Sequence, residues 1–102
     1  MNDAMIIGKK FIGEVKRSGI NVVDAYLYGS YAKLSANIDS DIDICVIATD
    51  LGTDLIDELV MLKQIARKVD DRIEAVPMGT VDFLDPFDPL VFEIKNTGIK
   101  IV

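Results

Sequence analysis

The most constraining feature of the chain is a Gly29-Ser30 pair followed, after ten intervening residues, by Asp41-Ile42-Asp43. Hydrophobic residues flank this motif at 25–28 and again at 44–47. Because side chains alternate along a strand, Asp41 and Asp43 would project from the same face. Two unpaired anions at the end of a mostly buried strand are costly unless a cation neutralises them. The motif therefore predicts two strands joined by a loop, with a divalent metal held at the start of the second strand.

The composition fits one small domain over residues 1–102. Half of the residues are hydrophobic, which disfavours disorder and allows one compact core. The net charge of −6 argues against direct nucleic-acid binding and against an anionic membrane surface. Histidine is absent, which excludes Ser-His-Asp and Cys-His catalysis and histidine-ligated zinc. The apolar runs are too short to span a bilayer, and the single cysteine fits a reducing compartment, so we expect a cytoplasmic protein.

Hydrophobic periodicity and turn residues divide the chain into helices and strands. The first expected element is a helix that begins after Asn2-Asp3 and stops at Gly19, and strands over 20–28 and 41–48 follow it. Next come a helix capped by Thr53-Asp54 and a strand over 72–76 that is closed by Pro77. The chain then forms a helix over 90–96 and a strand over 99–102.

The connections between these elements predict the topology. The link between the first two strands is too short for a crossover helix, so those strands should be antiparallel. The strand–helix–strand unit that follows should pair in parallel. The fold class is then α/β (α+β), with a small mixed sheet of about four strands flanked by helices. The end of the first strand meets the starts of the second and third, so Asp41, Asp43 and Glu74 should converge beside Gly29-Ser30.

The glycine–serine turn has the character of a phosphate site. Gly29 permits close backbone approach, and Ser30 offers a hydroxyl together with free N–H groups at the start of a short helical turn. Lys33, one turn further along, would add a positive charge.

The three carboxylates suit magnesium chemistry. Asp41 and Asp43 supply the oxygen ligands that Mg²⁺ prefers. Glu74 would complete the metal site or accept a proton from an attacking hydroxyl. Asp71 is the alternative third carboxylate. Phosphoryl and nucleotidyl transfer need metal-bound phosphates and an in-line nucleophile, so these reactions fit best.

The spacing of Gly29-Ser30 and Asp41-x-Asp43 resembles the signature of the DNA polymerase β-like nucleotidyltransferase superfamily, and in particular its minimal nucleotidyltransferases. Segments 73–77 and 93–99 extend this resemblance over most of the chain. The resemblance implies a polymerase β palm-like fold, a nucleoside triphosphate donor, two Mg²⁺ ions on Asp41 and Asp43, and Glu74 in the third carboxylate position. Two positions depart from the family pattern: Tyr31 stands where many members carry arginine, and Leu34 where many carry glycine.

The resemblance also implies a biological setting. Minimal nucleotidyltransferases are often encoded beside a helical HEPN protein, and some act as antitoxins by transferring AMP from ATP to a tyrosine of that toxin. Two alternatives stay open: a catalytically weak or inactive antitoxin that acts by contact alone, and a Mg²⁺-dependent nucleotide hydrolase. The apolar stripe of the helix after Asp54 is either core or partly a homodimer face.

Overall fold

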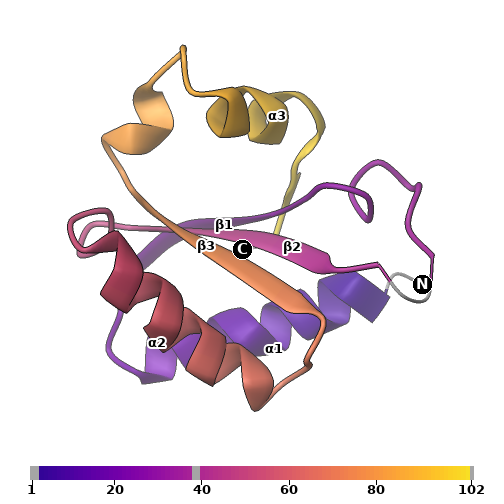
Figure 1. Cartoon of the computed structure of the whole chain (residues 1–102), viewed down its shortest axis with the longest axis horizontal. Helices are drawn as coiled ribbons and strands as arrows, with labels where there is room; N and C mark the ends of the chain where they lie inside the picture. Colours follow the sequence, from indigo (N-terminus) through magenta and orange to yellow (C-terminus); the bar gives the residue numbers. More distant parts are fainter. Residues whose placement is uncertain (1–2, 38–39, 102) are drawn as a thin grey trace.

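The computed structural model, which describes residues 3–37 and 40–101, has three layers. Helices α1 (Asp3–Arg17) and α2 (Leu55–Arg67) cover one face of a sheet, and helix α3 (Pro89–Thr97) lies over the other (Figure 1). The predicted N-cap residue Asn2 lies outside the described residues. No helix of the described chain is long and apolar enough to cross a membrane.

The sheet has four strands in the order β3-β2-β1-β4. These are β1 (Val22–Tyr28), β2 (Ile42–Ala48), β3 (Ile73–Gly79) and β4 (Ile99–Lys100). Strand β1 pairs antiparallel with both β2 and β4, and β2 pairs in parallel with β3. The predicted mixed sheet and its strand directions are confirmed.

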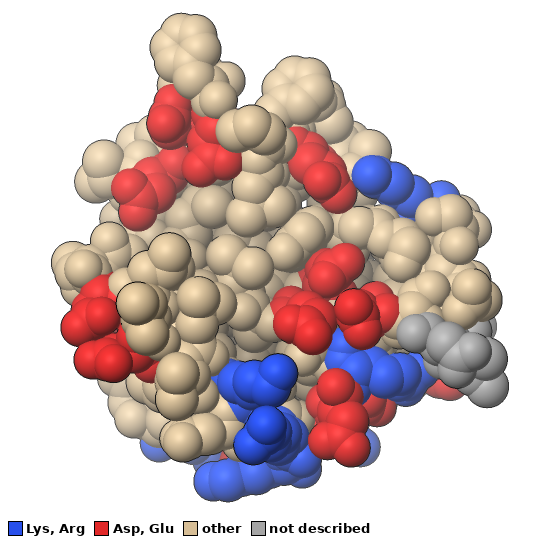
Figure 2. Space-filling view, in the orientation of Figure 1, with Lys and Arg blue, Asp and Glu red and all other residues tan. Residues whose placement is uncertain are grey.

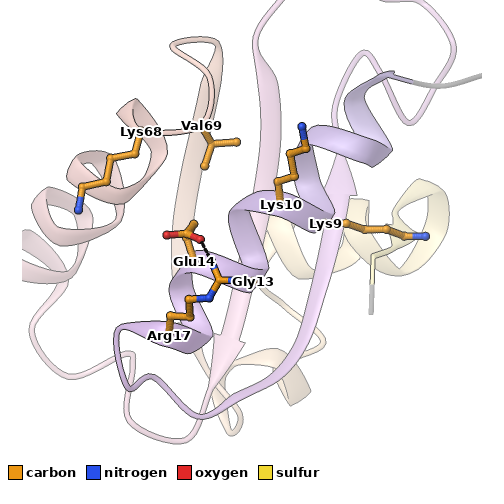
Figure 3. A pocket seen from close by; sticks show the side chains of 7 residues that line it. All are labelled: Lys9, Lys10, Gly13, Glu14, Arg17, Lys68 and Val69. Carbon is orange, nitrogen blue, oxygen red and sulfur yellow. Dashed lines mark hydrogen bonds and ion pairs between the residues drawn. The ribbon is translucent and has the colours of Figure 1, made fainter.

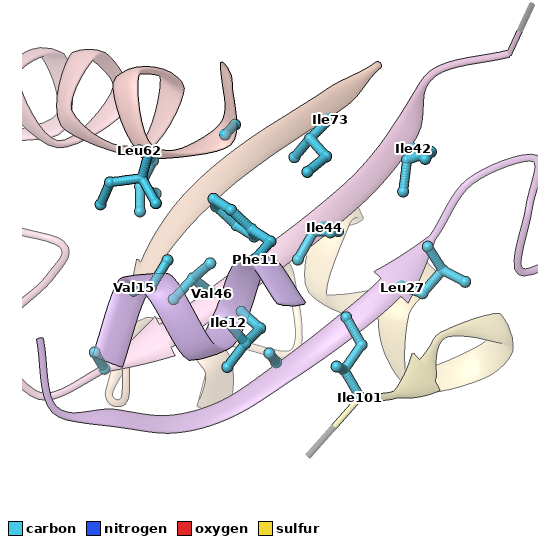
Figure 4. Close-up of a cluster of buried hydrophobic side chains, with 14 of the residues drawn as sticks. Phe11, Ile12, Val15, Leu27, Ile42, Ile44, Val46, Leu62, Ile73 and Ile101 are labelled. Carbon is cyan, nitrogen blue, oxygen red and sulfur yellow. The ribbon is translucent and has the colours of Figure 1, made fainter. Parts of the chain in front are cut away.

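The main core lies between the sheet and the α1/α2 layer. Alternate residues of β2 point into it and are fully buried: Ile42, Ile44 and Val46. They meet Phe11 of α1 and Leu62 of α2 in one cluster (Figure 4). Burying each such side chain contributes about 1.5–3 kcal/mol, so this cluster is the main source of stability.

A smaller cluster holds α3 against the other face. The apolar residues of β2 that point this way are Cys45 and Ile47, and they pack with Val91 and Ile94 of α3. Helix α3 begins at Pro89, one residue before the predicted start. Proline is favoured at a first helical position, and the Asp88 carboxylate accepts hydrogen bonds from the N–H groups of Leu90 and Val91 at 2.8 and 3.4 Å.

The start of α2 uses a different capping group from the predicted one. Asp54 is the N-cap residue, but its side chain makes no capping hydrogen bond. The buried carboxylate of Glu58 instead accepts hydrogen bonds from the N–H groups of Gly52, Thr53 and Asp54. Burial alone would raise the pKa of Glu58, but these bonds hold it below its usual range.

Several bounds differ from the prediction: β1 begins at Val22 rather than residue 20, and β2 begins at Ile42, which leaves Asp41 just outside the strand. Strand β3 does not close at Pro77 but continues to Gly79; it is an edge strand, paired on one side only, where a residue without an N–H is tolerated. A 3₁₀ turn, η1 (Asp82–Leu84), precedes α3 and was not predicted. The last strand covers Ile99–Lys100 rather than 99–102, and Val102 lies outside the described residues.

Candidate active site

The turn after β1 lies against the start of β2. Gly29 has a φ of +73°, which glycine adopts without steric cost. A Cβ at this position would lie 3.2 Å from the Cγ of Asp43 and closer still to one carboxylate oxygen. The backbone conformation therefore favours glycine here, and the absence of a side chain lets the turn lie close against the Asp43 carboxylate.

Residues 29–35 form a tight turn with helical character. The N–H of Lys33 donates to the carbonyl of Gly29 at 3.1 Å, and the N–H of Ser35 donates to the carbonyl of Ser30 at 2.9 Å. Within the described chain, no hydrogen bond uses the N–H groups of residues 30–32. Free N–H groups at the start of such a turn can bind a phosphate oxygen.

Strand pairing brings Asp43 and Glu74, two of the three predicted acidic residues, side by side, and Asp41 lies just before β2. Tyr28 of β1 pairs with Asp43 of β2, which pairs in turn with Glu74 of β3. Directly paired residues share a face, here the face covered by α3. Asp43 is half-buried, whereas Glu74 and Asp41 are exposed. Figure 2 shows acidic side chains gathered near this end of the sheet, between the layer of α3 and the layer of α1 and α2.

The carboxylates in this group act on one another. Burial raises the pKa of Asp43 to about 6, and the negative charges of Asp41, Glu74 and Glu93 add to the increase. Burial and then the charge of Asp43 also raise the pKa of the Tyr28 hydroxyl. Burial and the neighbouring carboxylates therefore disfavour the ionised form of Asp43. A cation bound beside Asp43 would favour the ionised form instead.

Glu93 belongs to this group and was missed at the sequence level. It lies on α3, and its carboxylate is 3.4 Å from the Nζ of Lys33. The signal was weak: Glu93 lies at the edge of the apolar stripe of α3, a common place for a solvated glutamate. The structure places Lys33, predicted to bind phosphate, in an ion pair that joins the turn to α3.

The donor chemistry at this site fits Mg²⁺. Carboxylate oxygens are its preferred protein ligands, and the raised pKa of Asp43 indicates an uncompensated negative field. Within residues 3–37 and 40–101, however, no three acidic or cysteine side chains are arranged closely enough to hold an ion ready-made. Binding of Mg²⁺ by Asp41, Asp43 and Glu74 therefore remains a prediction.

Tyr31, one of the two departures from the family pattern, connects the turn after β1 to the start of β3 through its hydroxyl group. Its hydroxyl donates to the carbonyl of Asn37 and accepts from Arg72, each at 3.3 Å. Arg72 also makes hydrogen bonds to the Asp70 carboxylate, and these bonds lower the pKa of Asp70. Asp71, the alternative third carboxylate, is exposed and is not among the charges that act on Asp43.

A groove of about 600 Å³ lies elsewhere, between α1 and the end of α2 (Figure 3). None of the predicted site residues lines it. Its lining is mostly basic and consists of Lys9, Lys10, Gly13, Glu14, Arg17, Lys68 and Val69. The acidic group and this groove are therefore separate parts of the surface with opposite charge.

Comparison with known protein families gives one match over most of the chain. The polymerase beta nucleotidyltransferase family matches residues 10–102. A search of curated proteins found no significant match.

Several solved structures have the same fold. A Sulfolobus solfataricus protein described as a nucleotidyltransferase superposes with a TM-score of 0.69 at 17% identity, covering 96% of this chain and 78% of that one. A toxin–antitoxin complex with AMP-PNP gives a TM-score of 0.67 at 24% identity, covering 92% and 72%. The toxin–antitoxin MntA–HpeT, with two aspartates replaced by glutamates, gives 0.65 at 21%, covering 91% and 70%.

The match over residues 10–102 and the mixed sheet agree with the resemblance that the Gly29-Ser30 and Asp41-x-Asp43 motif indicated. The chain belongs to the polymerase beta nucleotidyltransferase family.

Proposed function

We propose that this nucleotidyltransferase moves AMP from ATP to a hydroxyl group of a partner protein, in the cytoplasm, with Mg²⁺ held by Asp41, Asp43 and Glu74. The acceptor is a tyrosine of a helical HEPN toxin, which the transfer inactivates. The observation that carries the proposal is the packing of the Gly29 turn against Asp43, in the same row of the sheet as Glu74.

This arrangement puts phosphate-binding groups beside metal-binding groups. The free N–H groups of residues 30–32 and the Ser30 hydroxyl would bind the triphosphate. Lys33 would exchange its contact with Glu93 for a phosphate oxygen, since a doubly charged phosphate group attracts an ammonium more strongly than one carboxylate does. When bound, Mg²⁺ would neutralise the developing negative charge on the phosphates.

In the transfer step, the acceptor oxygen attacks the α-phosphorus and the bond to the pyrophosphate oxygen breaks. Glu74 accepts the hydroxyl proton, since it is exposed at the rim of the site, next to Asp43. Pyrophosphate leaves with the electron pair of the broken bond. The exposed position of Glu74 leaves room for an acceptor that belongs to another protein.

The structural neighbours support the donor and the setting. One is a toxin–antitoxin complex with AMP-PNP, an ATP-like ligand. Another is MntA–HpeT with two aspartates replaced, two positions apart in its own sequence, as Asp41 and Asp43 are here. These proteins are less than 25% identical to this chain, so their partners and ligands are guides to what should be tested.

A second candidate is an antitoxin that acts by contact alone. The carboxylates of the described chain do not form a ready-made metal group, and Leu34 has a φ of +59° where many relatives carry glycine. In this case the acidic residues would contribute no turnover, and binding to the toxin would be the whole activity.

A label-transfer assay distinguishes the two candidates. The chain is incubated with Mg²⁺, the protein encoded by the neighbouring gene, and ATP labelled at the α-phosphate or, separately, at the γ-phosphate. AMP transfer predicts that the α-label alone enters the partner. Entry of the γ-label would instead indicate phosphate transfer, and release of labelled nucleotide without protein labelling would indicate a hydrolase.

Matched variants assign the residues. Asp41→Asn and Asp43→Asn should abolish labelling while the complex still forms. Glu74→Gln should lower the rate on the order of a hundredfold, whereas Asp71→Asn should leave it within a factor of two or so, because Asp71 does not act on Asp43. Equal labelling by wild type and Asp43→Asn would refute the proposal, and neutralisation without any labelling would favour the contact-only antitoxin.

A further inference from the structure

Tyr31 lies in the middle of the turn after β1 that carries the free N–H groups. Its own N–H is one of the three that no hydrogen bond of the described chain uses, between those of Ser30 and Ala32. Its ring packs against the main core cluster, and its hydroxyl donates to the carbonyl of Asn37. The side chain of Tyr31 therefore anchors the turn to the core between the sheet and the layer of α1 and α2.

The same hydroxyl joins the turn to a distant segment of the chain. It accepts a hydrogen bond at 3.3 Å from one terminal nitrogen of Arg72, which is 41 residues further along. Asp70 holds Arg72 in turn, because the Nε and the other terminal nitrogen of Arg72 donate to its two carboxylate oxygens, each at 3.1 Å. A bidentate contact of this kind fixes the plane of the guanidinium group. The remaining nitrogen of Arg72 is thereby directed at Tyr31.

The backbone of Arg72 connects this contact to the acidic residues of the candidate active site. Its carbonyl accepts a hydrogen bond at 2.8 Å from the N–H of Ile42, which lies between Asp41 and Asp43 in the sequence. Glu74 follows two positions after Arg72, on β3. Arg72 therefore contacts the turn through its side chain and the start of β2 through its backbone. The contact between Tyr31 and Arg72 links the free N–H groups to the strands that carry the carboxylates.

The ion pair on the other side of the turn does not provide the same link once a nucleotide is bound. Lys33 pairs with Glu93 of α3 at 3.4 Å, and both side chains are partly exposed. In the proposed function, Lys33 leaves Glu93 for a phosphate oxygen, so this contact is broken as the triphosphate binds. The contact between Tyr31 and Arg72 uses none of the groups that bind phosphate or metal, so it persists. Backbone donors that are held in place before a ligand arrives bind it at a lower cost in entropy.

We propose that Tyr31 and Arg72 are positioning residues, and that the hydrogen bond between them holds the N–H groups of residues 30–32 in place, beside Asp41 and Asp43, for binding a nucleoside triphosphate. Neither side chain needs to touch the nucleotide. A phenylalanine ring would pack against the core as well, so the role belongs to the hydroxyl group of Tyr31. The inference rests on the nucleotide donor of the proposed function and does not depend on the acceptor.

Calorimetric titration with the ATP analogue AMP-PNP in the presence of Mg²⁺ tests this role. Tyr31→Phe keeps the ring and removes the contact with Arg72, so the dissociation constant should rise about fivefold, which corresponds to the net contribution of one hydrogen bond. Arg72→Met should have a similar effect. The double variant should bind scarcely more weakly than either single variant, because both changes remove the same contact. Tyr26→Phe, which removes a hydroxyl group elsewhere on β1, should bind like wild type.

Two further measurements separate positioning from a purely structural role. In the label-transfer assay, Tyr31→Phe should raise KM for ATP by a similar factor and leave kcat within about twofold of wild type, since the N–H groups bind the substrate and the transition state alike. Amide hydrogen exchange at residues 30–32 should slow when AMP-PNP is added to wild type, and it should slow less in Tyr31→Phe. A side chain that only stabilises the fold would lower the urea midpoint and change neither quantity.

Equal affinity of wild type and Tyr31→Phe for AMP-PNP would overturn the inference, as would effects of Tyr31→Phe and Arg72→Met that add in full, or an equal loss in Tyr26→Phe. These outcomes are separable from those that test the proposed function. Nucleotide binding that depends on Tyr31, without any labelling of the partner, would overturn AMP transfer and support the positioning role. A wild-type chain that binds no nucleotide would overturn both.

Discussion

The two faces of β2 carry residues of opposite character within a few positions of each other. Ile42 and Ile44 point toward α1 and α2 and are fully buried in the main core. Asp43 lies between them and points to the α3 face, where burial and neighbouring carboxylates raise its pKa to about 6. One short strand therefore has two separate roles. Its isoleucines stabilise the sheet from one face, and on the other face Asp43 lies where its ionised form is disfavoured.

The acidic face should tolerate substitution that removes its chemistry. Asp43→Asn keeps the shape of the side chain but loses a charge, so transfer activity should fall on the order of a thousandfold, about 4 kcal/mol. The free energy of unfolding should hold or rise, because a disfavoured carboxylate is removed. Rate measurements and urea denaturation on the same preparation check both effects. A large loss of stability would show that Asp43 also has a structural role.

The core face should show the reverse behaviour. Ile44→Ala should lower the free energy of unfolding by about 4 kcal/mol, near the upper part of the usual range for such cavities. Ile47→Ala, in the smaller cluster under α3, should cost about 2 kcal/mol because fewer fixed neighbours surround it. Urea denaturation measures both, with Leu84→Ala, 70% exposed, as a control expected within about 0.5 kcal/mol of wild type. Equal costs for Ile44→Ala and Ile47→Ala would remove the distinction between the two clusters.

The pH dependence of stability sharpens the comparison. The pKa of Asp43 is higher in the folded chain than in the unfolded one, so the folded state binds more protons between pH 3.8 and about 6. The contribution of Asp43 to stability is fully present below pH 3.8 and is lost as the pH rises through about 6. Because the side chain is half exposed and screened, the expected loss is about 1 kcal/mol.

Unfolding curves of wild type and Asp43→Asn over this pH range isolate the effect. The difference in stability between them should change by that amount, and Mg²⁺ at neutral pH should stabilise wild type but not the variant. A difference independent of pH would mean that the field around Asp43 is weak.

The smallest effect concerns the turn beside the acidic face. Leu34 is 87% exposed and has a φ of +59°, a conformation that costs a residue with a side chain roughly 1–2 kcal/mol. Leu34→Gly should relieve this strain but also raise the conformational entropy of the unfolded chain. The free energy of unfolding should therefore rise by only about 0.5–1 kcal/mol. A rise in Tm of a few degrees would confirm it. Leu34→Ala, which keeps the strain, should show no gain.

Much of this arrangement was readable in the sequence because it follows from short-range rules. Strand alternation and loop length were enough to predict that Asp43 and Glu74 would meet beside Gly29, and the strand register agrees with that prediction. The involvement of Glu93 was not readable, since it depends on how α3 packs across the sheet, a contact between distant segments. The φ of Leu34 was also missed, because no local pattern requires a left-handed leucine.

Pro77 has a consequence for the outer edge of the sheet. It lies within β3, whose far side pairs with no other described strand. A proline in an edge strand discourages other chains from adding to the sheet by backbone pairing. Pro77 thereby disfavours growth of the sheet from one molecule to the next through this edge.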